Sequence, residues 1–85
     1  MAHNQGVQVR FTQSARRHRI GKARALHVMN HAEPISVPSD EELQVRLLWI
    51  GTDDRGPELE VVAIVELDQL LVIHVMPTQF RRRSP

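Results

Sequence analysis

Three apolar runs in the second half of the chain limit its fold more than any other feature. They cover residues 45–50, 59–65 and 70–76. Their β-branched side chains and short lengths favour strands over buried helix segments. Only a few residues separate one run from the next, and connections this short join antiparallel neighbours. We therefore expect an antiparallel meander of three strands.

Both faces of this meander are rich in aliphatic side chains. The chain has helix enough to cover one face, so we expect the other face to bind a protein partner or a second copy. A loop one residue longer or shorter would turn every side chain of the following strand to the opposite face of the sheet. If both loops hold an even number of residues, the partner face includes Leu48, Val61, Val72 and Met76. The full set on that face is then Arg46, Leu48, Ile50, Leu59, Val61, Ala63, Val65, Val72, His74 and Met76.

The length and composition predict one small domain. The 85 residues contain no cysteine, which excludes disulfides and thiolate metal sites. The apolar runs are too short to span a membrane, and residues 1–6 lack the apolar core of a signal peptide. We expect a cytoplasmic protein that does not enter membranes. Its single domain spans residues 1–85, with an ordered core over residues 7–80 and a frayed tail over residues 81–85.

The first half of the chain predicts one strand and two helices. Residues 7–11 alternate as an edge strand, and Thr12 or Ser14 can cap a short helix over residues 15–19. A second helix over residues 22–31 has one buried stripe and ends before Pro34. Residues 34–42 are expected to form a loop. The predicted class is α+β in the order β-α-α-β-β-β, an antiparallel sheet with two helices packed on one face. The stripe consists of Ala25, Val28, Met29 and Ala32.

Charge is distributed unevenly along the chain. Residues 1–32 contain six lysines and arginines and no acid, whereas residues 33–68 contain ten acids and two arginines. Three further arginines follow in the tail. A basic segment of this kind is typical of a surface that faces phosphates. The alternative is that solvated helices simply carry arginine on their exposed faces.

Histidine and arginine are the residues that could carry chemistry. Cleavage of a phosphodiester needs a base for the 2′-hydroxyl proton and a cation for the oxyanion, and His and Arg can supply both. His18 lies in the basic cluster Arg16-Arg17-His18-Arg19, and His74 lies in an apolar run. His74 is either a half-buried structural histidine or the partner of Arg46 on the open face. His27 and His31 share a helix side without further ligands, so we expect neither a metal site nor a cofactor.

Two segments resemble the BrnT-like toxins of the RelE superfamily. Residues 14–20 are similar to the basic-His-Gly-hydrophobic segment that opens these toxins. Residues 48–62 are similar to their hairpin, in which a charged turn separates Leu-Gly from Leu-Val-Val. The resemblance spans residues 7–83. It implies the RelE-like ribonuclease fold and a type II toxin that cuts RNA without a metal ion, inhibits translation and is neutralised by an antitoxin encoded by an adjacent gene.

The chain departs from these toxins at two places. Their Lys-His-Gly is Arg17-His18-Arg19 here, and Met76 stands where their last strand ends in arginine. Arg81 or Arg82 could replace that arginine if the tail folds back. The second departure favours a non-catalytic module.

The leading hypothesis is thus an endoribonuclease toxin acting on RNA, free or on the ribosome. One alternative is a non-catalytic RNA- or protein-binding module of the same fold, and another is a homodimer that pairs its open face. The first catalytic candidates are His18 with Arg16 or Arg17, which would transfer protons and bind phosphate. The second candidates are His74 and Arg46, and Arg81 would supply a cation for the oxyanion. The RNA-binding candidates are Arg19, Lys22, Arg24 and Arg82.

Overall fold

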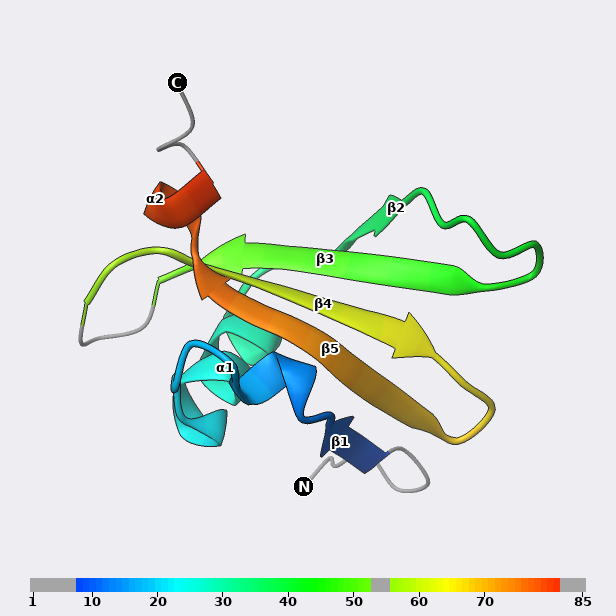
Figure 1. Cartoon of the computed structure of the whole chain (residues 1–85), viewed down its shortest axis with the longest axis horizontal. Coiled ribbons are helices and arrows are strands. Elements are labelled where there is room, and N and C mark those ends of the chain that lie inside the picture. The colour runs from blue at the N-terminus through cyan, green and yellow to red at the C-terminus, as the bar shows by residue number, and fades with distance from the viewer. Residues whose placement is uncertain (1–7, 53–55, 82–85) are drawn as a thin grey trace.

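The chain crosses a five-stranded sheet from one edge to the other and then returns through its middle (Figure 1). The computed structural model describes residues 8–52 and 56–81. β1 (Gln8–Phe11) and β2 (Ile35–Val37) form the two edges. β3 (Val45–Gly51), β4 (Leu59–Val65) and β5 (Gln69–Pro77) lie between them, in the order β1-β5-β4-β3-β2. The helix α2 (Thr78–Arg81) follows β5 directly.

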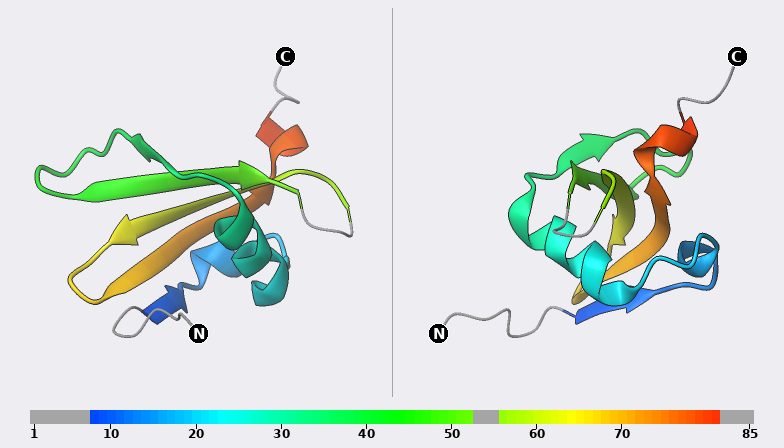
Figure 2. Two further views of the ribbon diagram at one scale, coloured as in Figure 1. Left: turned by 180° about the vertical axis from the view of Figure 1, so that it is seen from behind. Right: turned by 90° about the vertical axis from the view of Figure 1, so that its left-hand side faces the viewer.

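The predicted antiparallel meander is confirmed as β3, β4 and β5. β1 joins the edge of this meander as expected, but it runs parallel to its neighbour β5. After β1, α1 (Lys22–His31) carries the chain over one face of the sheet to the far edge, where β2 begins (Figure 2). The sheet is therefore mixed, with one parallel pair.

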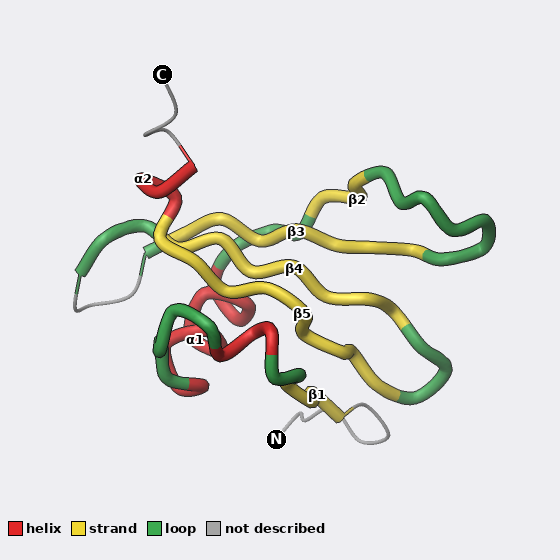
Figure 3. The backbone as a smooth tube through the Cα atoms, viewed as in Figure 1, coloured by secondary structure: helices red, strands yellow, loops and turns green. Residues whose placement is uncertain are grey.

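The prediction of two helices packed on the sheet is wrong, because α1 is the one helix of the described residues that packs on its face. The first predicted helix is a single 3-10 turn, η1 (Ser14–Arg16), which Figure 3 shows between β1 and α1. Its sequence offers Ala15 as its one buried side chain, followed by four polar residues, so a longer helix would have no apolar stripe to bury. Arg19 then adopts a positive φ of 59°, which turns the chain toward α1.

The segment predicted as a loop over residues 34–42 contains the strand β2. Ile35 pairs with Leu48 and Val37 pairs with Arg46, so β2 extends the sheet by one edge strand. The β-branched Ile35 and Val37 favour this extended backbone, and the free edge of β3 supplies the hydrogen-bond partners.

The pairing of β3 with β4 is shifted by one residue from the predicted register, so the side chains of β4 lie on the faces opposite to those predicted. Gly51 pairs with Leu59, so an odd number of residues separates the two strands. Trp49 then lies opposite Val61, and both side chains face α1. Glu60 and its alternate neighbours in β4 lie on the opposite face.

A β-bulge changes the alternation within β5. Val62 pairs with His74, whereas Ala63 pairs with Val72, so Ile73 is an extra residue in β5. The extra residue lets Val72 and Val75 both point into the core, although they are three positions apart.

The core lies between one face of the sheet and the segment formed by η1 and α1, with α1 packed on β3 and β4 and η1 packed on β5. The predicted stripe of α1 is confirmed: Ala25 and Val28 are fully buried, and Met29 and Ala32 pack against the core. The helix ends at His31, before Pro34, as predicted. The buried residues are Ala15, Ala25, Val28, Trp49, Leu59, Val61, Ala63, Val72 and Val75.

Candidate functional site

The face of the sheet opposite α1, which we call the open face, is not covered by a helix within residues 8–52 and 56–81 (Figure 2). It combines aliphatic side chains with three polar ones, those of Arg46, Glu60 and His74. Its side chains from the three central strands are Arg46, Leu48, Ile50, Glu60, Val62, Ile64, Leu71, Ile73, His74 and Met76.

Strand pairing brings the polar groups of this face close together. Leu48, Val62 and His74 lie side by side across three strands. Glu60 lies diagonal to His74, two positions before Val62, and Arg46 lies two positions before Leu48. Side chains in such diagonal positions are about 7–8 Å apart at their backbones, which long side chains can bridge.

The β-bulge of β5 decides where His74 points. In a regular strand, alternation from the buried Val72 would direct Ile73 to the open face and His74 toward the core. With the bulge, both Ile73 and His74 contribute to the open face. Bulges commonly re-aim a side chain next to a functional site.

Glu60 and His74 form a close polar pair. His74 Nε2 lies 2.8 Å from Glu60 Oε2, and the two side chains are 34% and 7% exposed. A nearly buried carboxylate needs hydrogen-bond donors, and the imidazole is one of them. With Nε2–H donating to Glu60, Nδ1 is the nitrogen that can accept a proton.

A shallow hollow of about 490 Å³ surrounds this pair on the open face. Its floor is aliphatic, and its polar groups come from three different strands. Such a combination of an apolar surface with a few convergent polar groups is typical of binding and catalytic sites. The hollow is lined by Val37, Arg46, Leu48, Glu60, Val62, Ile73 and His74.

Arg46 supplies the positive charge of the hollow. Its Nε donates a hydrogen bond of 2.7 Å to Gln44 Oε1, which also accepts one from Ser39 Oγ. This bond orients the guanidinium and engages only Nε, so the two terminal nitrogens can donate to an anion. Arg46 is level with Leu71, two strands from β5 and three residues before His74. Both long side chains line the same hollow, so a phosphate in the hollow can be reached by Arg46 and by His74.

The other predicted catalytic residues lie outside this hollow. Arg16 belongs to η1, and Arg17 and His18 follow it. η1 is held beside β5, because Ser14 Oγ donates to the backbone oxygen of Ile73 at 3.0 Å. These three residues thus lie at the sheet edge next to β5. Arg81 ends α2, and its side chain lies outside the described residues.

The predicted RNA-binding residues are spread over several surfaces. Arg19 is exposed in the turn after η1. Lys22 Nζ lies 5.6 Å from the centre of the Phe11 ring, and Phe11 packs against the core, so Lys22 is on the α1 side of β1. Arg24 is half-buried near Gly56. Arg82 lies outside the described residues.

The predicted partner-binding residues divide between the two faces. Leu48 and Met76 are on the open face. Val61 and Val72 are fully buried in the core, so their assignment to a partner surface is wrong. The odd loop before β4 and the bulge in β5 are the physical reasons for this difference.

Glu60 is the site residue that the sequence interpretation missed. It stands alone among aliphatic residues in β4, as His74 does in β5. A carboxylate within such a run must find a partner on folding, and a histidine in the neighbouring run is an obvious one. This shared signal was present in the sequence, but the assumed loop parity placed the two residues on opposite faces.

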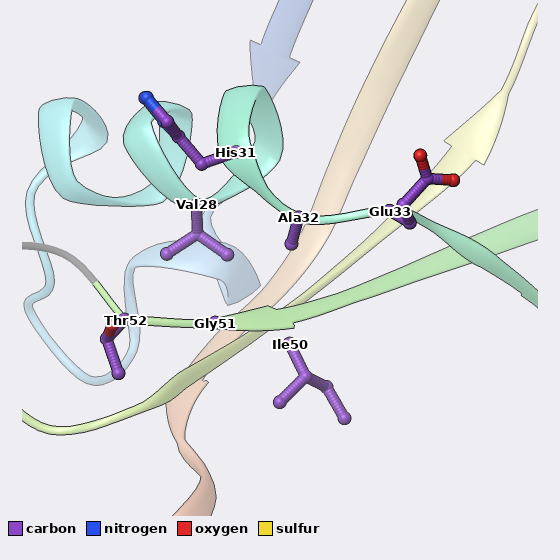
Figure 4. A pocket seen from close by; sticks show the side chains of 7 residues that line it. All are labelled: Val28, His31, Ala32, Glu33, Ile50, Gly51 and Thr52. Carbon is purple, nitrogen blue, oxygen red and sulfur yellow. The ribbon is translucent and has the colours of Figure 1, made fainter.

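A second hollow lies between the end of α1 and β3, with a volume of about 350 Å³. Its two titratable side chains belong to His31 and Glu33, and Figure 4 shows their polar ends pointing away from each other. Gly51 lies close beneath Val28 and Ala32, which leaves mainly backbone and aliphatic groups there. This hollow lacks the convergent polar groups of the first.

His27 and His31 stack on the surface of α1, with ring centres 4.1 Å apart. His31 Nδ1 lies 2.8 Å from the backbone oxygen of His27, and this contact orients the second ring. Within the described ranges, no group of three or more His, Cys, Asp or Glu side chains could hold a metal ion. We therefore assign this pair no ligand.

Comparison with known proteins yields no match to this chain. No protein-family model fits it, and neither a curated protein nor a solved structure is similar to it. In the part of the chain that the structure describes, no helix has the length and apolar character needed to cross a membrane.

Proposed function

We propose that this protein is an endoribonuclease that cuts RNA without a metal ion, with His74 and Arg46 as catalytic residues. The observation that carries the proposal is the 2.8 Å contact of His74 with the nearly buried Glu60 in a hollow that Arg46 also lines. Glu60 is the positioning residue for His74. The proposal rests on this site and on the basic N-terminal segment, and it does not depend on the fold class.

The residues of the hollow are sufficient for transphosphorylation of RNA. His74 Nδ1 accepts the proton of a 2′-hydroxyl, and the 2′-oxygen attacks the adjacent phosphorus. The bond to the 5′-oxygen breaks, and this leaving oxygen takes a proton from water. Arg46 donates to the phosphate oxygens while they carry extra negative charge, and Glu60 stabilises the imidazolium that forms. The products are a 2′,3′-cyclic phosphate and a 5′-hydroxyl.

The charge distribution supports a polyanionic substrate. Residues 8–32 contain six lysines and arginines and no acid, and Arg10, Arg16, Arg17 and Arg19 are exposed. Such a segment attracts nucleic acid through its phosphates, independently of base sequence. The 2′-hydroxyl is the group that lets a site containing one general base act on RNA and spare DNA.

We also propose that the ribonuclease is the toxin of a type II toxin–antitoxin pair, which acts in the cytoplasm and inhibits translation. The resemblance of residues 14–20 and 48–62 to BrnT-like toxins supports this role. The aliphatic open face, where Ile50 is 40% exposed, suits an antitoxin that covers the hollow and blocks it. The adjacent gene would encode that partner.

The test is cleavage of a single-stranded RNA by the full-length chain in the presence of EDTA. We expect fragments that end in a 2′,3′-cyclic phosphate, and no cleavage of the DNA of the same sequence. His74→Gln should lower the rate by at least about 100-fold, because one positioned general base contributes roughly that much. Arg46→Gln should also slow cleavage.

His31→Gln is the matched control, since His31 is exposed on α1 and lies outside the hollow. It should cleave RNA like the unchanged protein. Intact RNA after incubation with folded, unchanged protein would contradict the proposal. Cleavage that persists in His74→Gln would show that the catalytic residues lie outside the hollow.

A second candidate is a non-catalytic module that binds RNA or protein through the open face. The position of the aromatic side chains favours its protein-binding form: Phe11 and Trp49 both face α1, so neither offers the open face a stacking surface for bases. This candidate predicts a complex with a protein partner that Leu48→Arg disrupts, together with intact RNA in the cleavage assay.

A further inference from the structure

We infer that Arg10 holds a second phosphate of the substrate, outside the scissile position, so that the RNA strand runs from the hollow over β5 and β1. This inference rests on the proposed ribonuclease function and adds a subsite to it. The ligand is a phosphodiester group of single-stranded RNA.

The position of Arg10 on β1 places it on the open-face side of the sheet. Val9 and Phe11 pack against the core, and residues in a strand alternate between faces, so Arg10 points the other way. Arg10 pairs with Leu71 of β5 in the parallel register. Within the described residues, no hydrogen bond or ion pair engages its exposed side chain.

The lining of the hollow separates Arg10 from the scissile phosphate, because Arg46 and His74 both line the hollow and Arg10 does not. Arg10 lies one strand away from β5, at the level of Leu71, and His74 lies three residues further along β5. With strand spacings of about 4.8 Å and a rise of about 3.3 Å per residue, the two backbones are roughly 11 Å apart. A phosphate held in the hollow by Arg46 and His74 leaves Arg10, outside the hollow, for the next part of the strand.

Charge decides over which edge of the sheet the RNA leaves the hollow. Beyond β3, the segments flanking β2 expose Glu33 and the acids of residues 40–42. Beyond β5, the edge carries Arg10 and the exposed Arg16 and Arg17 of the segment around η1. The acids Glu66 and Asp68 lie near the first residue of β1, on the side of Arg10 away from His74. A phosphate chain is thus repelled at the β2 edge and attracted at the β1 edge.

The experiment compares two substrates, a dinucleoside monophosphate and a single-stranded hexanucleotide with the same cleavable step. The dinucleotide contains only the scissile phosphate, so Arg10 has nothing to bind there. Arg10→Gln should lower kcat/KM for the hexanucleotide about tenfold, the loss expected for one hydrogen bond to a charged group. It should leave kcat/KM for the dinucleotide within about twofold, the scatter of such comparisons.

Lys22→Gln is the matched control, because it removes the same charge from the α1 side of β1. It should lower kcat/KM for the hexanucleotide clearly less than Arg10→Gln does, because it removes only the long-range attraction of one charge. Arg10→Lys should restore part of the lost rate, and circular dichroism should show that each variant is folded.

The outcomes separate this inference from the proposed function. If the unchanged protein cuts neither substrate, the ribonuclease proposal fails; hexanucleotide binding then tests the subsite, and Arg10→Gln should reduce the slope of log K against log salt by about 0.7. If the unchanged protein cuts both substrates and Arg10→Gln affects them equally, or affects neither, the second phosphate subsite is overturned.

Discussion

At the scale of single residues, the pairing of Glu60 with His74 explains why two titratable groups lie within aliphatic strands. The Glu60 side chain is only 7% exposed, and a carboxylate in that environment is destabilising unless donors surround it. His74 is such a donor, and the carboxylate in turn fixes which ring nitrogen carries the proton. The pair therefore has a structural role and supplies an oriented base as well.

Glu60→Gln tests the positioning role at this scale. Glutamine has the size of glutamate and still offers an oxygen to Nε2, but it lacks the charge that stabilises the imidazolium. We expect kcat for RNA cleavage to fall by about 10- to 100-fold, with KM nearly unchanged. Steady-state kinetics on a single-stranded RNA measure both constants. Glu58→Gln is the control, since Glu58 bonds Thr78 Oγ1 at the end of the sheet. A rise in KM at unchanged kcat would instead make Glu60 a substrate-binding residue.

At the scale of elements, the segments that form the central strands and α1 were predictable from the sequence. The face of the sheet that each strand's side chains occupy was not predictable. The three apolar runs became β3, β4 and β5, and the stripe of α1 is buried as expected, because periodicity depends only on neighbouring residues. The face of β4 depends on whether the preceding loop has an odd or even length, and the face of His74 depends on one bulge. Hydrophobicity could not decide either, since both faces are aliphatic.

The candidate site was predictable only in part. Arg46 and His74 were expected to share the open face, and the structure places both in one hollow. Glu60 was assigned to the wrong face by the same parity error that misplaced Val61. The first predicted helix failed because Arg16, Arg17 and His18 offer no side chain to bury, whereas β2 formed because a neighbouring strand had a free edge.

Adjacent valines of β4 test the register directly. Val61 is fully buried, whereas Val62 lies half-buried on the open face. Val61→Ala should lower the free energy of unfolding by about 2–3 kcal/mol, because it leaves a cavity under α1. Val62→Ala should cost clearly less, about 1 kcal/mol or below. Urea denaturation followed by tryptophan fluorescence of Trp49 measures both. A larger loss for Val62→Ala than for Val61→Ala would support the register predicted from the sequence, in which Val61 lies on the open face.

At the scale of the whole molecule, the sheet separates charge between its two edges. The β1 edge and η1 carry exposed arginines, and the segments around β2 carry exposed acids. The net charge of +1 conceals this separation. The hollow lies between the two edges. Under the proposed function, the basic edge would attract the RNA strand and the acidic edge would face a basic region of a partner.

Growth after expression of this chain alone tests the proposed toxin role at the same scale. Unchanged protein should arrest growth, because uncontrolled cleavage of RNA stops translation, and His74→Gln should relieve the arrest at an equal level of folded protein. His18→Ala should still arrest growth, since His18 follows η1 and does not line the hollow. Culture density and plated survivors after induction measure the effect. Relief by His18→Ala but not by His74→Gln would place the chemistry beside η1, and growth unaffected by the unchanged protein would contradict a toxin.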